Sequence, residues 1–318
     1  MGTASITKSV IPAIIRSEFN EVSAIASRDR NRAGQWAKHL NIPKSYGSYE
    51  DMLATGGFDI VYNPLPNSMH AQWTINVLKA GYPVLCEKPF ALNKKQAEDV
   101  MKVSKKTGLP VAEAFMYRFH PMFNRVKEII ANNIIGDIVS IDSRFSFFED
   151  DRSSIVRSSE LGGGALMDVG CYCVNLSRTI TGTEPIRVTA LKSGQDIDET
   201  MMGILKFPNI LARFETSIVS SEQHEAEICG TKGIIRIPEP WLPGMQETQL
   251  LIQQWGKPDQ VIPIPGADTY RLEIEDFSMA VRTGNSPRWT VNDAIANMAV
   301  IDALFESSRT GHHVMVEK

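Results

Sequence analysis

The chain has 318 residues and a formal net charge of −4, with 43 % apolar and 22 % charged residues. These values are typical of globular proteins, and they exclude disordered and fibrous classes. The weak acidity gives no reason to expect a nucleic acid or an anionic membrane as a partner. The sequence shows neither an apolar run of about 18 residues nor a signal peptide after Met1, so we expect a cytoplasmic protein. Of the four cysteines only Cys171 and Cys173 are close together, which predicts reduced thiols and no metal site.

The first third of the chain alternates between short apolar runs and helical stretches. A helix is expected at 6–15, and the later helical stretches lie at 31–40, 68–80 and 94–107. The apolar runs between them lie at 21–26, 58–63, 83–86 and 110–114. Strands of about 4–8 residues that alternate with helices predict βαβ units and a parallel sheet.

The pattern changes after Phe119. Helices are expected at 121–132, 165–181, 270–283 and 291–308. Alternating segments predict strands at 138–148, 186–191, 200–207, 212–219, 225–229 and 234–237. We therefore expect an α/β protein with a dinucleotide-binding domain at 1–118 and a second α/β domain at 119–318, built on a large, mostly antiparallel open sheet. Helices on one side cannot cover both faces of that sheet, which predicts a homodimer or homotetramer formed through it.

Small residues precede the first helix, and they form a degenerate dinucleotide loop. The hexapeptide is Gly2-Thr3-Ala4-Ser5-Ile6-Thr7, in which Ala4 and Thr7 replace the second and third glycines of such a loop. Such residues let the backbone approach a pyrophosphate, and the N-terminus of a helix favours that anion. An ordinary helix N-cap made of small residues is an equally good interpretation of this hexapeptide.

Ser27 and Arg28 follow the strand expected at 21–26, where a dinucleotide fold places the adenosine ribose. An arginine at this point accommodates the 2′-phosphate of NADP, whereas an acidic residue binds the 2′-hydroxyl of NAD. The pair therefore favours NADP over NAD. Asp29 would favour NAD if it turned inward, and a solvated loop is the interpretation without a ligand.

Two loops leave the carboxyl ends of expected parallel strands, where such sheets bind ligands. The second loop is Glu87-Lys88-Pro89, and Lys88 would hold a ribose hydroxyl and a substrate oxygen there. Its charge would also lower the pKa of a nearby acid. The first loop contains Pro64, Leu65, Pro66, Asn67 and His70. The alternative interpretation of this first loop is a rigid turn, and that of the second loop is a surface salt bridge.

Asp168 and Tyr172 lie four residues apart in the helix expected at 165–181, and therefore on one face of it. A carboxylate and a phenol on one face suit the binding of a substrate hydroxyl and the transfer of a proton. The alternative is a core tyrosine beside an aspartate that interacts with the helix dipole.

In combination, four segments resemble the Gfo/Idh/MocA oxidoreductases. They are Glu87-Lys88-Pro89, the turn LPNSMH at 65–70, MYRFHP at 116–121 and GGGALMDVGCYCVN at 162–175. The resemblance runs from Gly2 to the end of the chain. It implies a Rossmann domain followed by an α/β domain with an open, largely antiparallel sheet. It also implies a nicotinamide cofactor and hydride transfer at a sugar or a related carbinol.

By this resemblance, Lys88 matches the catalytic lysine of the family. Tyr172 matches the acid–base tyrosine of the branch with glucose–fructose oxidoreductase and dimeric dihydrodiol dehydrogenase, and Asp168 matches the carboxylate one turn earlier. Ser27 and Arg28 match the 2′-phosphate site of the members that use NADP. The other positions that match cofactor contacts are Leu65, Pro66, Asn67, His70, Glu87 and Arg118.

Members of the family have an apolar strand directly before the glycine loop, and only Met1 precedes Gly2 here. We therefore expect the first Rossmann strand to be missing, through a start assigned too far downstream or a truncation. The sequence predicts an NAD(P)-dependent oxidoreductase, with NADP preferred, for a small sugar, sugar derivative or cyclic diol. A non-catalytic NADP-binding sensor and a structural subunit are the alternatives, and Lys88, Asp168 and Tyr172 favour the enzyme.

Overall fold

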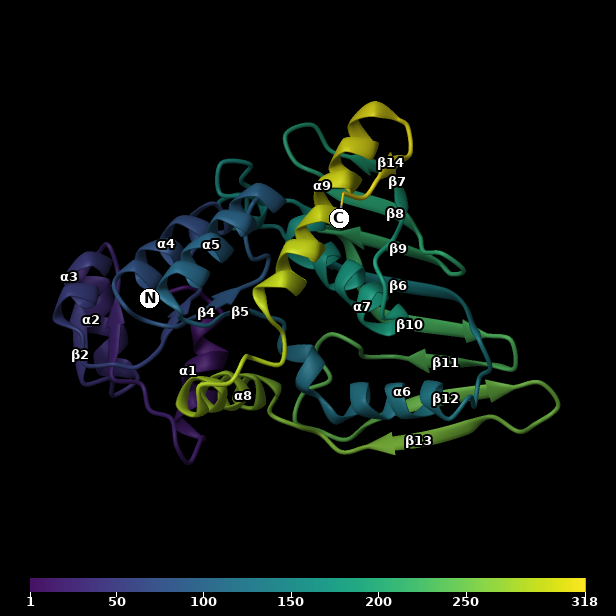
Figure 1. Ribbon diagram of the computed structural model, residues 1–318, viewed down its shortest axis with the longest axis horizontal. Helices are drawn as coiled ribbons and strands as arrows, with labels where there is room; N and C mark the ends of the chain where they lie inside the picture. Colours follow the sequence, from purple (N-terminus) through teal and green to yellow (C-terminus); the bar gives the residue numbers. More distant parts are fainter. Residues whose placement is uncertain (318) are drawn as a thin grey trace. The chain divides into compact units, whose positions relative to one another are not determined.

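The computed structural model describes residues 1–317, which form two compact units (Figure 1). Unit 1 comprises Met1–Met116 and Tyr270–Ile295, and unit 2 comprises Tyr117–Thr269 and the described residues from Ala296 onward. The domains predicted from the sequence differ from these units mainly in the segment Tyr270–Ile295. That segment joins unit 1 because Phe277 of helix α8 (Thr269–Thr283) packs in a core cluster with Leu85 and Ala112.

Unit 1 has the expected alternation of strands and helices. Two short elements were not predicted, β2 (Lys44–Tyr46) and α3 (Tyr49–Thr55). All of its strand pairs, β1 with β2, β3 with β4 and β4 with β5, are parallel, as expected. The other elements are α1 (Thr7–Ile15), β1 (Ala24–Ala26), α2 (Arg30–His39), β3 (Val61–Asn63), α4 (Asn67–Lys79), β4 (Val84–Glu87), α5 (Lys94–Thr107) and β5 (Val111–Ala114).

The strands of unit 1 form two separate sheets in the described chain, β1–β2 and β3–β4–β5. The backbone at Met1 and Gly2 links them. The amino group of Met1 donates a hydrogen bond of 2.7 Å to the carbonyl of Tyr62 in β3, and the N–H of Gly2 donates one of 2.8 Å to the carbonyl of Ala26. Because Ala26 is the last residue of β1, the glycine loop starts at the carboxyl end of that strand.

The helices of unit 1 begin in two different ways. Asp29, Ser48 and Asn93 cap α2, α3 and α5, since their side-chain oxygens accept hydrogen bonds from backbone N–H groups in the first turn. The N-cap residues of α1 and α4 are Ile6 and Pro66, and neither makes a side-chain cap hydrogen bond. No N-cap side chain therefore occupies the first N–H groups of α1 and α4.

Unit 2 is built on a nine-stranded sheet in the order β13–β12–β11–β10–β6–β9–β8–β7–β14. Strands β6 and β9 run parallel, and the other neighbouring pairs are antiparallel, which confirms the predicted large, mostly antiparallel sheet. The three strands that come last in the sequence, β12, β13 and β14, were not predicted. The strands are β6 (Ile138–Phe148), β7 (Arg187–Ser193), β8 (Thr200–Lys206), β9 (Leu211–Ser217), β10 (Val219–Gly230), β11 (Gly233–Ile237), β12 (Thr248–Gln254), β13 (Gln260–Ile264) and β14 (Val314–Met315).

One face of this sheet is covered and the other is exposed. Along β8, Met201 and Leu205 are buried, whereas Met202 and Ile204 are 53 % and 51 % exposed. The covered face packs against a helical segment that the sequence predicted as one helix at 165–181. The structure has instead a π-helical turn, Leu166–Gly170, followed by helix α7, Cys171–Thr181. Unit 2 also contains α6 (Pro121–Ala131), the 3₁₀ helix Ile155–Arg157, and most of the 3₁₀ helix Met116–Phe119 and of α9 (Val291–Thr310).

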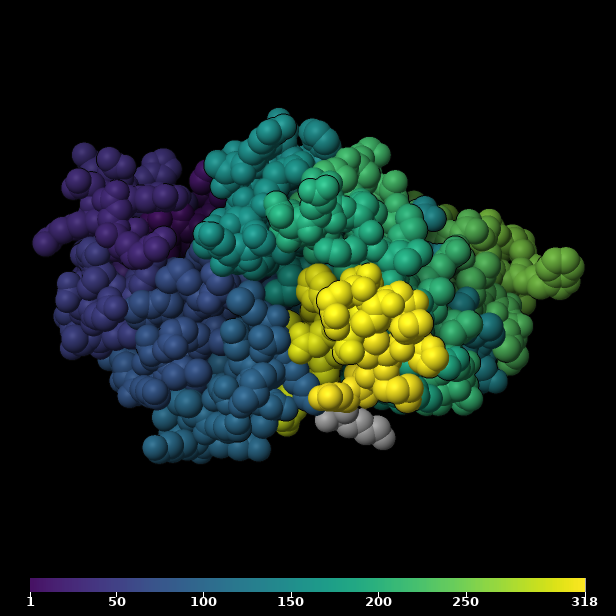
Figure 2. All heavy atoms as spheres, turned by 90° about the horizontal axis from the view of Figure 1, so that it is seen from above, coloured from purple at the N-terminus to yellow at the C-terminus, as the bar shows by residue number. Residues whose placement is uncertain are grey.

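The end of the described chain returns to the sheet edge. Strand β14 pairs antiparallel with β7, and the N–H of Val316 donates to the carbonyl of Ile186 at 3.0 Å. Figure 2 shows this C-terminal segment in yellow against the green part of the same unit. Within residues 1–317, no helix is both long and apolar enough to cross a membrane.

Candidate active site

The glycine loop and the turn after β3 meet closely in unit 1. Gly2 has a φ of +77°, and a Cβ atom there would lie 3.0 Å from Cδ2 of Leu65 and 3.9 Å from Pro64. Both the backbone conformation and the space therefore favour glycine. The carbonyl of Thr3 accepts a hydrogen bond of 3.1 Å from Nη2 of Arg32, which fixes the next residue of the loop to α2.

Residues 4–6 form the tight turn that starts α1. The N–H and hydroxyl of Thr7 both donate to the carbonyl of Ala4, at 3.0 and 2.5 Å, and the N–H of Lys8 donates to Ser5. Ile6 then occupies the N-cap position without a side-chain hydrogen bond. The loop is therefore a tight helix start, in which the N–H groups of Thr7 and Lys8 already donate to backbone carbonyls of the loop.

Ser27 and Asp29 are engaged with the backbone at the end of β1. The buried Ser27 hydroxyl accepts a hydrogen bond of 3.2 Å from the N–H of Asp29. Oδ1 of Asp29 accepts bonds of 2.8 and 3.1 Å from the N–H groups of Asn31 and Arg32. The Asp29 carboxylate thus caps α2, which weakens the case for an NAD-type ribose contact from this residue.

Arg28 is exposed, and it lies near Arg32, which was not among the predicted site residues. Burial raises the pKa of Tyr49, and the guanidinium groups of Arg28 and Arg32 oppose that rise, so both cations approach the same phenol. The spacing of four residues between Arg28 and Arg32, across the start of α2, was the sequence signal that could have predicted this pair. Two guanidinium groups near one phenol suit the binding of a phosphate.

His70 joins the two loops that leave β3 and β4. The ring is 1 % exposed, with Nδ1 2.7 Å from the carbonyl oxygen of Pro89 and Nε2 2.6 Å from that of Leu65. Burial, with a smaller contribution from the charge of Lys88, lowers the pKa of His70 to about 4. Both ring nitrogens face backbone carbonyls, so the ring fixes the distance between these loops. The first of them continues through Pro66 and Asn67 into α4.

Glu87 and Lys88 end strand β4. Oε1 of the buried Glu87 accepts a hydrogen bond of 2.5 Å from the hydroxyl of Tyr62, and Oε2 accepts one of 3.3 Å from the N–H of Lys88. Just beyond, the N–H of Phe90 donates to Oε1 of Glu113 at 2.8 Å. Neighbouring strands β3 and β5 therefore hold the strand end at which the half-buried Lys88 is placed.

Asp168 and Tyr172 lie on one continuous helical segment of unit 2, as expected. Asp168 is half-buried in the π-helical turn, and Tyr172 is 6 % exposed in the first turn of α7. π-helical turns are rare and are found frequently at functional sites. Gly170 lets this turn approach the sheet, since a Cβ atom there would lie 3.1 Å from Cγ2 of Thr216 in β9.

Three aromatic rings surround the ring of Tyr172, and none of them was among the predicted site residues. The centroid distances are 5.6 Å to Tyr117, 5.3 Å to Phe145 and 6.0 Å to Trp241. Phe145 and Trp241 are stacked with an interplanar angle of 7°. Aromatic pairs at such distances contribute roughly 0.5–1.5 kcal/mol each beyond their burial. Tyr172 is thus a packed ring, which fixes where its hydroxyl is presented.

Arg118 and its neighbours connect this region to α6. Arg118 is 4 % exposed in the 3₁₀ helix Met116–Phe119, beside Tyr117. The hydroxyl of Tyr117 donates a hydrogen bond of 2.6 Å to Oδ1 of Asn175, three residues after Tyr172. The buried His120 caps α6 through Nδ1, which accepts from the N–H of the second helical residue at 3.2 Å, and burial lowers the pKa of His120.

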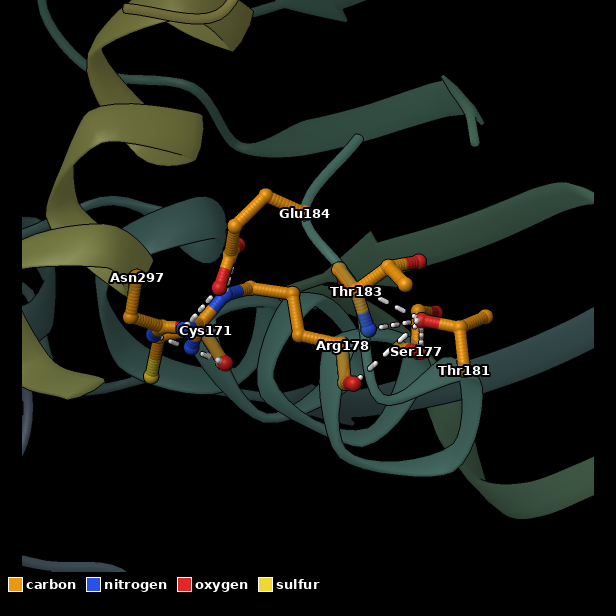
Figure 3. A network of polar contacts seen from close by, with 7 residues as sticks. All are labelled: Cys171, Ser177, Arg178, Thr181, Thr183, Glu184 and Asn297. Carbon is orange, nitrogen blue, oxygen red and sulfur yellow. Dashed lines mark hydrogen bonds and ion pairs between the residues drawn. The ribbon is translucent and has the colours of Figure 1, made fainter. Parts of the chain in front are cut away.

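A polar network around the buried Arg178 fixes α7 to α9 within unit 2 (Figure 3). Arg178 forms two hydrogen bonds with the carboxylate of Glu184, at 2.6 and 2.8 Å, and a third of 3.2 Å with Oδ1 of Asn297. Nδ2 of Asn297 then donates to the carbonyl of Cys171 at 3.4 Å. That carbonyl belongs to the peptide that joins Cys171 to Tyr172, so the network reaches the backbone of the candidate catalytic tyrosine.

The predicted site residues are divided between the two units. Unit 1 contains the glycine loop, Ser27, Arg28, the turn with His70, and Lys88, and unit 2 contains Arg118, Asp168 and Tyr172. Within unit 1 the structure brings Gly2 together with Leu65 and joins His70 to both loops. Within unit 2 it places Asp168 and Tyr172 on one segment.

Comparison with known proteins gives matches along most of the chain. The model described as "Oxidoreductase family, NAD-binding Rossmann fold" matches residues 1–115, and the one described as "GFO/IDH/MocA C-terminal domain" matches residues 123–236. D-xylose 1-dehydrogenase (NADP(+)) 2 of Haloferax volcanii is 38 % identical, with 100 % of this chain and 98 % of that protein covered. Trans-1,2-dihydrobenzene-1,2-diol dehydrogenase of Xenopus tropicalis is 35 % identical over 75 % of this chain and 72 % of its own.

Among solved structures, the chain is similar to KijD10, a 3-ketoreductase from Actinomadura kijaniata, in complex with NADP and TDP-benzene. The TM-score is 0.91 at 26 % identity, and the match covers 96 % of this chain and 95 % of that one. One family match lies in each of the two predicted domains, and the xylose dehydrogenase exceeds 30 % identity over its whole match. The chain belongs to the Gfo/Idh/MocA family of oxidoreductases.

Proposed function

We propose that the protein is an NADP-preferring oxidoreductase that transfers a hydride to or from a carbinol or ketone carbon of a sugar, sugar derivative or cyclic diol. The observation that carries this proposal is the helical segment on which Asp168 and the packed ring of Tyr172 lie, in a chain that matches both family models. The named relatives, a xylose dehydrogenase, a dihydrodiol dehydrogenase and a 3-ketoreductase, support the substrate class.

The residues of unit 1 fit a dinucleotide. The close approach of Gly2 to Leu65 and the α1 N-terminus, which has no side-chain cap, would hold the pyrophosphate. Ser27, Arg28 and Arg32 would hold the 2′-phosphate, which favours NADP and leaves NAD as a weaker ligand. Asp29 does not counter this preference, because its carboxylate caps α2. When bound, the nicotinamide supplies or accepts the hydride.

Tyr172 is the proton donor in this proposal. Reduction of a ketone leaves an alkoxide that must gain a proton, and oxidation requires a base for the hydroxyl proton. Asp168 would bind a neighbouring substrate hydroxyl and fix its orientation. Lys88 is assigned by the family resemblance as the cation that stabilises the anionic form of the reacting groups. An unperturbed phenol has a pKa of about 10, so Tyr172 needs such a cation to act as a base at neutral pH.

We also propose that the protein is cytoplasmic and assembles as a homodimer or homotetramer through the exposed face of the nine-stranded sheet. Three apolar side chains on β7 and β8, Leu191, Met202 and Ile204, are 72 %, 53 % and 51 % exposed on that face. Light scattering at micromolar concentration tests the assembly, and a strictly monomeric mass would contradict it.

The function is tested by titrating the protein with NADPH and NADH and assaying aldoses, inositols and cyclic diols with the cofactor that binds. Tyr172→Phe should lower kcat by about 10²–10⁴-fold, the usual range for general acid–base catalysis, with the Kd for NADPH changed less than threefold. Tyr46→Phe, at a half-buried tyrosine of β2, controls for the loss of a hydroxyl. Tight NADPH binding without turnover of any substrate would instead favour a sensor.

A further inference from the structure

Asp198 is a buried carboxylate that neither the sequence motifs nor the proposed catalytic set includes. It lies between β7 and β8 and is 2 % exposed. Oδ2 accepts a hydrogen bond of 2.6 Å from the backbone N–H of Leu166, and its own carbonyl accepts one of 2.7 Å from the N–H of Ala165. Two consecutive N–H groups at the start of the helical segment therefore bind one residue.

The glycine run before this segment makes the contact possible. Gly164 has a φ of +113°, and a Cβ atom there would lie 2.2 Å from Oδ1 of Asp198. A side chain at this position would therefore displace the carboxylate. The third glycine of the run thus permits the close approach of Asp198.

The contact has a direct electrostatic reason. The first N–H groups of a helix lack intrahelical partners and carry a partial positive charge, so an anion placed there stabilises the helix start. Asp198 comes from a different element, 32 residues away from Leu166, and so it also fixes the start of the segment to the β7–β8 turn. Leu166 precedes Asp168 by two residues and Tyr172 by six.

We propose that Asp198 is a positioning residue whose carboxylate holds the start of the helical segment, and thereby holds Asp168 and Tyr172 in their reactive placement. The proposal rests on the proposed function for its catalytic consequence. The π-helical turn lies between the contact at Leu166 and Tyr172, and its extra residue widens the helix there. A fixed start of the segment is therefore important for the placement of Tyr172.

Glu199 provides a matched control beside it. Its Oε1 accepts from Nη1 of Arg157 at 3.4 Å, and Nε of Arg157 donates to the carbonyl of Glu149 at 2.8 Å. Glu199 thus holds the loop at 149–157, whereas Asp198 holds the helical segment. Glu199→Gln removes one negative charge from the same turn and leaves the hydrogen bonds of Asp198 in place.

The experiment compares Asp198→Ala, Asp198→Asn and Glu199→Gln in the full-length protein. Asp198→Ala should lower kcat by about 10–100-fold, with KM and the Kd for NADPH changed less than threefold, since Asp198 acts on the placement of the reacting groups. Asp198→Asn keeps an oxygen acceptor for Leu166 and should restore kcat to within threefold. Glu199→Gln should also keep kcat within threefold. A general loss of structure would not be rescued by asparagine and would change the Kd as well.

A second measurement does not depend on activity. Hydrogen–deuterium exchange in a peptide covering residues 163–170 should become at least tenfold faster in Asp198→Ala, with exchange in β6 unchanged. If the wild type turns over no sugar or diol, the proposed function fails, and this exchange rate alone decides whether the anchor exists. Should the alanine variant not fold, Asp198→Ser takes its place with the same expected direction. Unchanged kcat and unchanged exchange in a folded variant would overturn the proposal.

Discussion

The hydroxyl of Tyr62 donates a hydrogen bond of 2.5 Å to Oε1 of Glu87, so a residue of β3 holds the carboxylate that precedes Lys88 on β4. Burial, and then the negative charge of Glu87, raise the pKa of Tyr62 well above its usual value. The phenol therefore stays protonated and remains a donor over the whole range of pH in which the protein is expected to work. The strand end that presents Lys88 thus depends on a residue outside the Glu-Lys-Pro motif.

Tyr62→Phe should lower the free energy of unfolding by about 1–3 kcal/mol, because Glu87 loses a donor in a buried environment. The measurement is urea unfolding at pH 7, with Tyr46→Phe as the control for loss of a hydroxyl. Equal unfolding midpoints for Tyr62→Phe and the wild type would show that the bond contributes nothing to stability.

Arg28→Ala should weaken NADPH binding at least tenfold and change NADH binding less than threefold, since only NADPH has the 2′-phosphate. Arg32→Ala should show the same preference and should also loosen the glycine loop, because Arg32 donates to the carbonyl of Thr3. Fluorescence titration of both variants with NADPH and NADH gives four dissociation constants, which are compared with those of the wild type. A similar loss for NADPH and NADH in Arg28→Ala would reduce that residue to a structural role.

Gly163→Ala should destabilise the protein by about 1–3 kcal/mol, the usual cost of overpacking. A Cβ atom at Gly163 would lie 2.4 Å from the carbonyl oxygen of Val156 and 2.7 Å from that of Ile155, and backbone atoms cannot move aside cheaply. Gly34→Ala is the matched control, because it lies inside α2 with no heavy atom within 4 Å of its Cβ position. That variant should gain about 0.5–1 kcal/mol. Thermal or urea unfolding of both variants checks the opposite signs.

The free energy of unfolding should decrease as the pH rises, because of Asp198. Burial raises the pKa of this carboxyl from 3.8 to about 6, and the bond from Leu166 and the charge of Lys192 oppose the rise. The folded state therefore binds the proton more tightly than the unfolded state. The contribution of Asp198 to the free energy of unfolding is complete below pH 3.8 and is lost as the pH rises through about 6.

The loss amounts to about 3 kcal/mol at most, since each pKa unit is worth about 1.36 kcal/mol. Asp198→Asn cannot titrate, so the difference in unfolding free energy between this variant and the wild type should change by that amount between pH 3.5 and 7.5. Urea unfolding of both proteins at five pH values measures it, and the other titrating groups cancel in the difference. Parallel pH curves would contradict the assignment.

The sequence by itself determined the bounds of those helices and strands whose ends are set by neighbouring residues. Helix α5 has the predicted bounds, Lys94–Thr107, because Asn93 caps its start and Gly108 adopts the left-handed conformation at its end. Strand β6 has the predicted bounds because its alternation of polar and apolar residues matches a sheet with one covered face. The motifs also identified the residues proposed for catalysis, Lys88, Asp168 and Tyr172, since each stands in a recognisable run of neighbours.

Tertiary structure decided what depends on partners that are distant in the sequence. Strand β2, with three residues, exists through its pairing with β1, and the last three strands likewise follow from their neighbours in the sheet. The π-helical turn replaced part of a predicted α-helix where Gly170 packs on β9. Asp198 and Trp241 contact the segment with the candidate catalytic residues because the fold places them against Leu166 and Tyr172. Their contacts span 32 residues or more, and no local pattern encodes a contact whose energy arises only after the chain has folded.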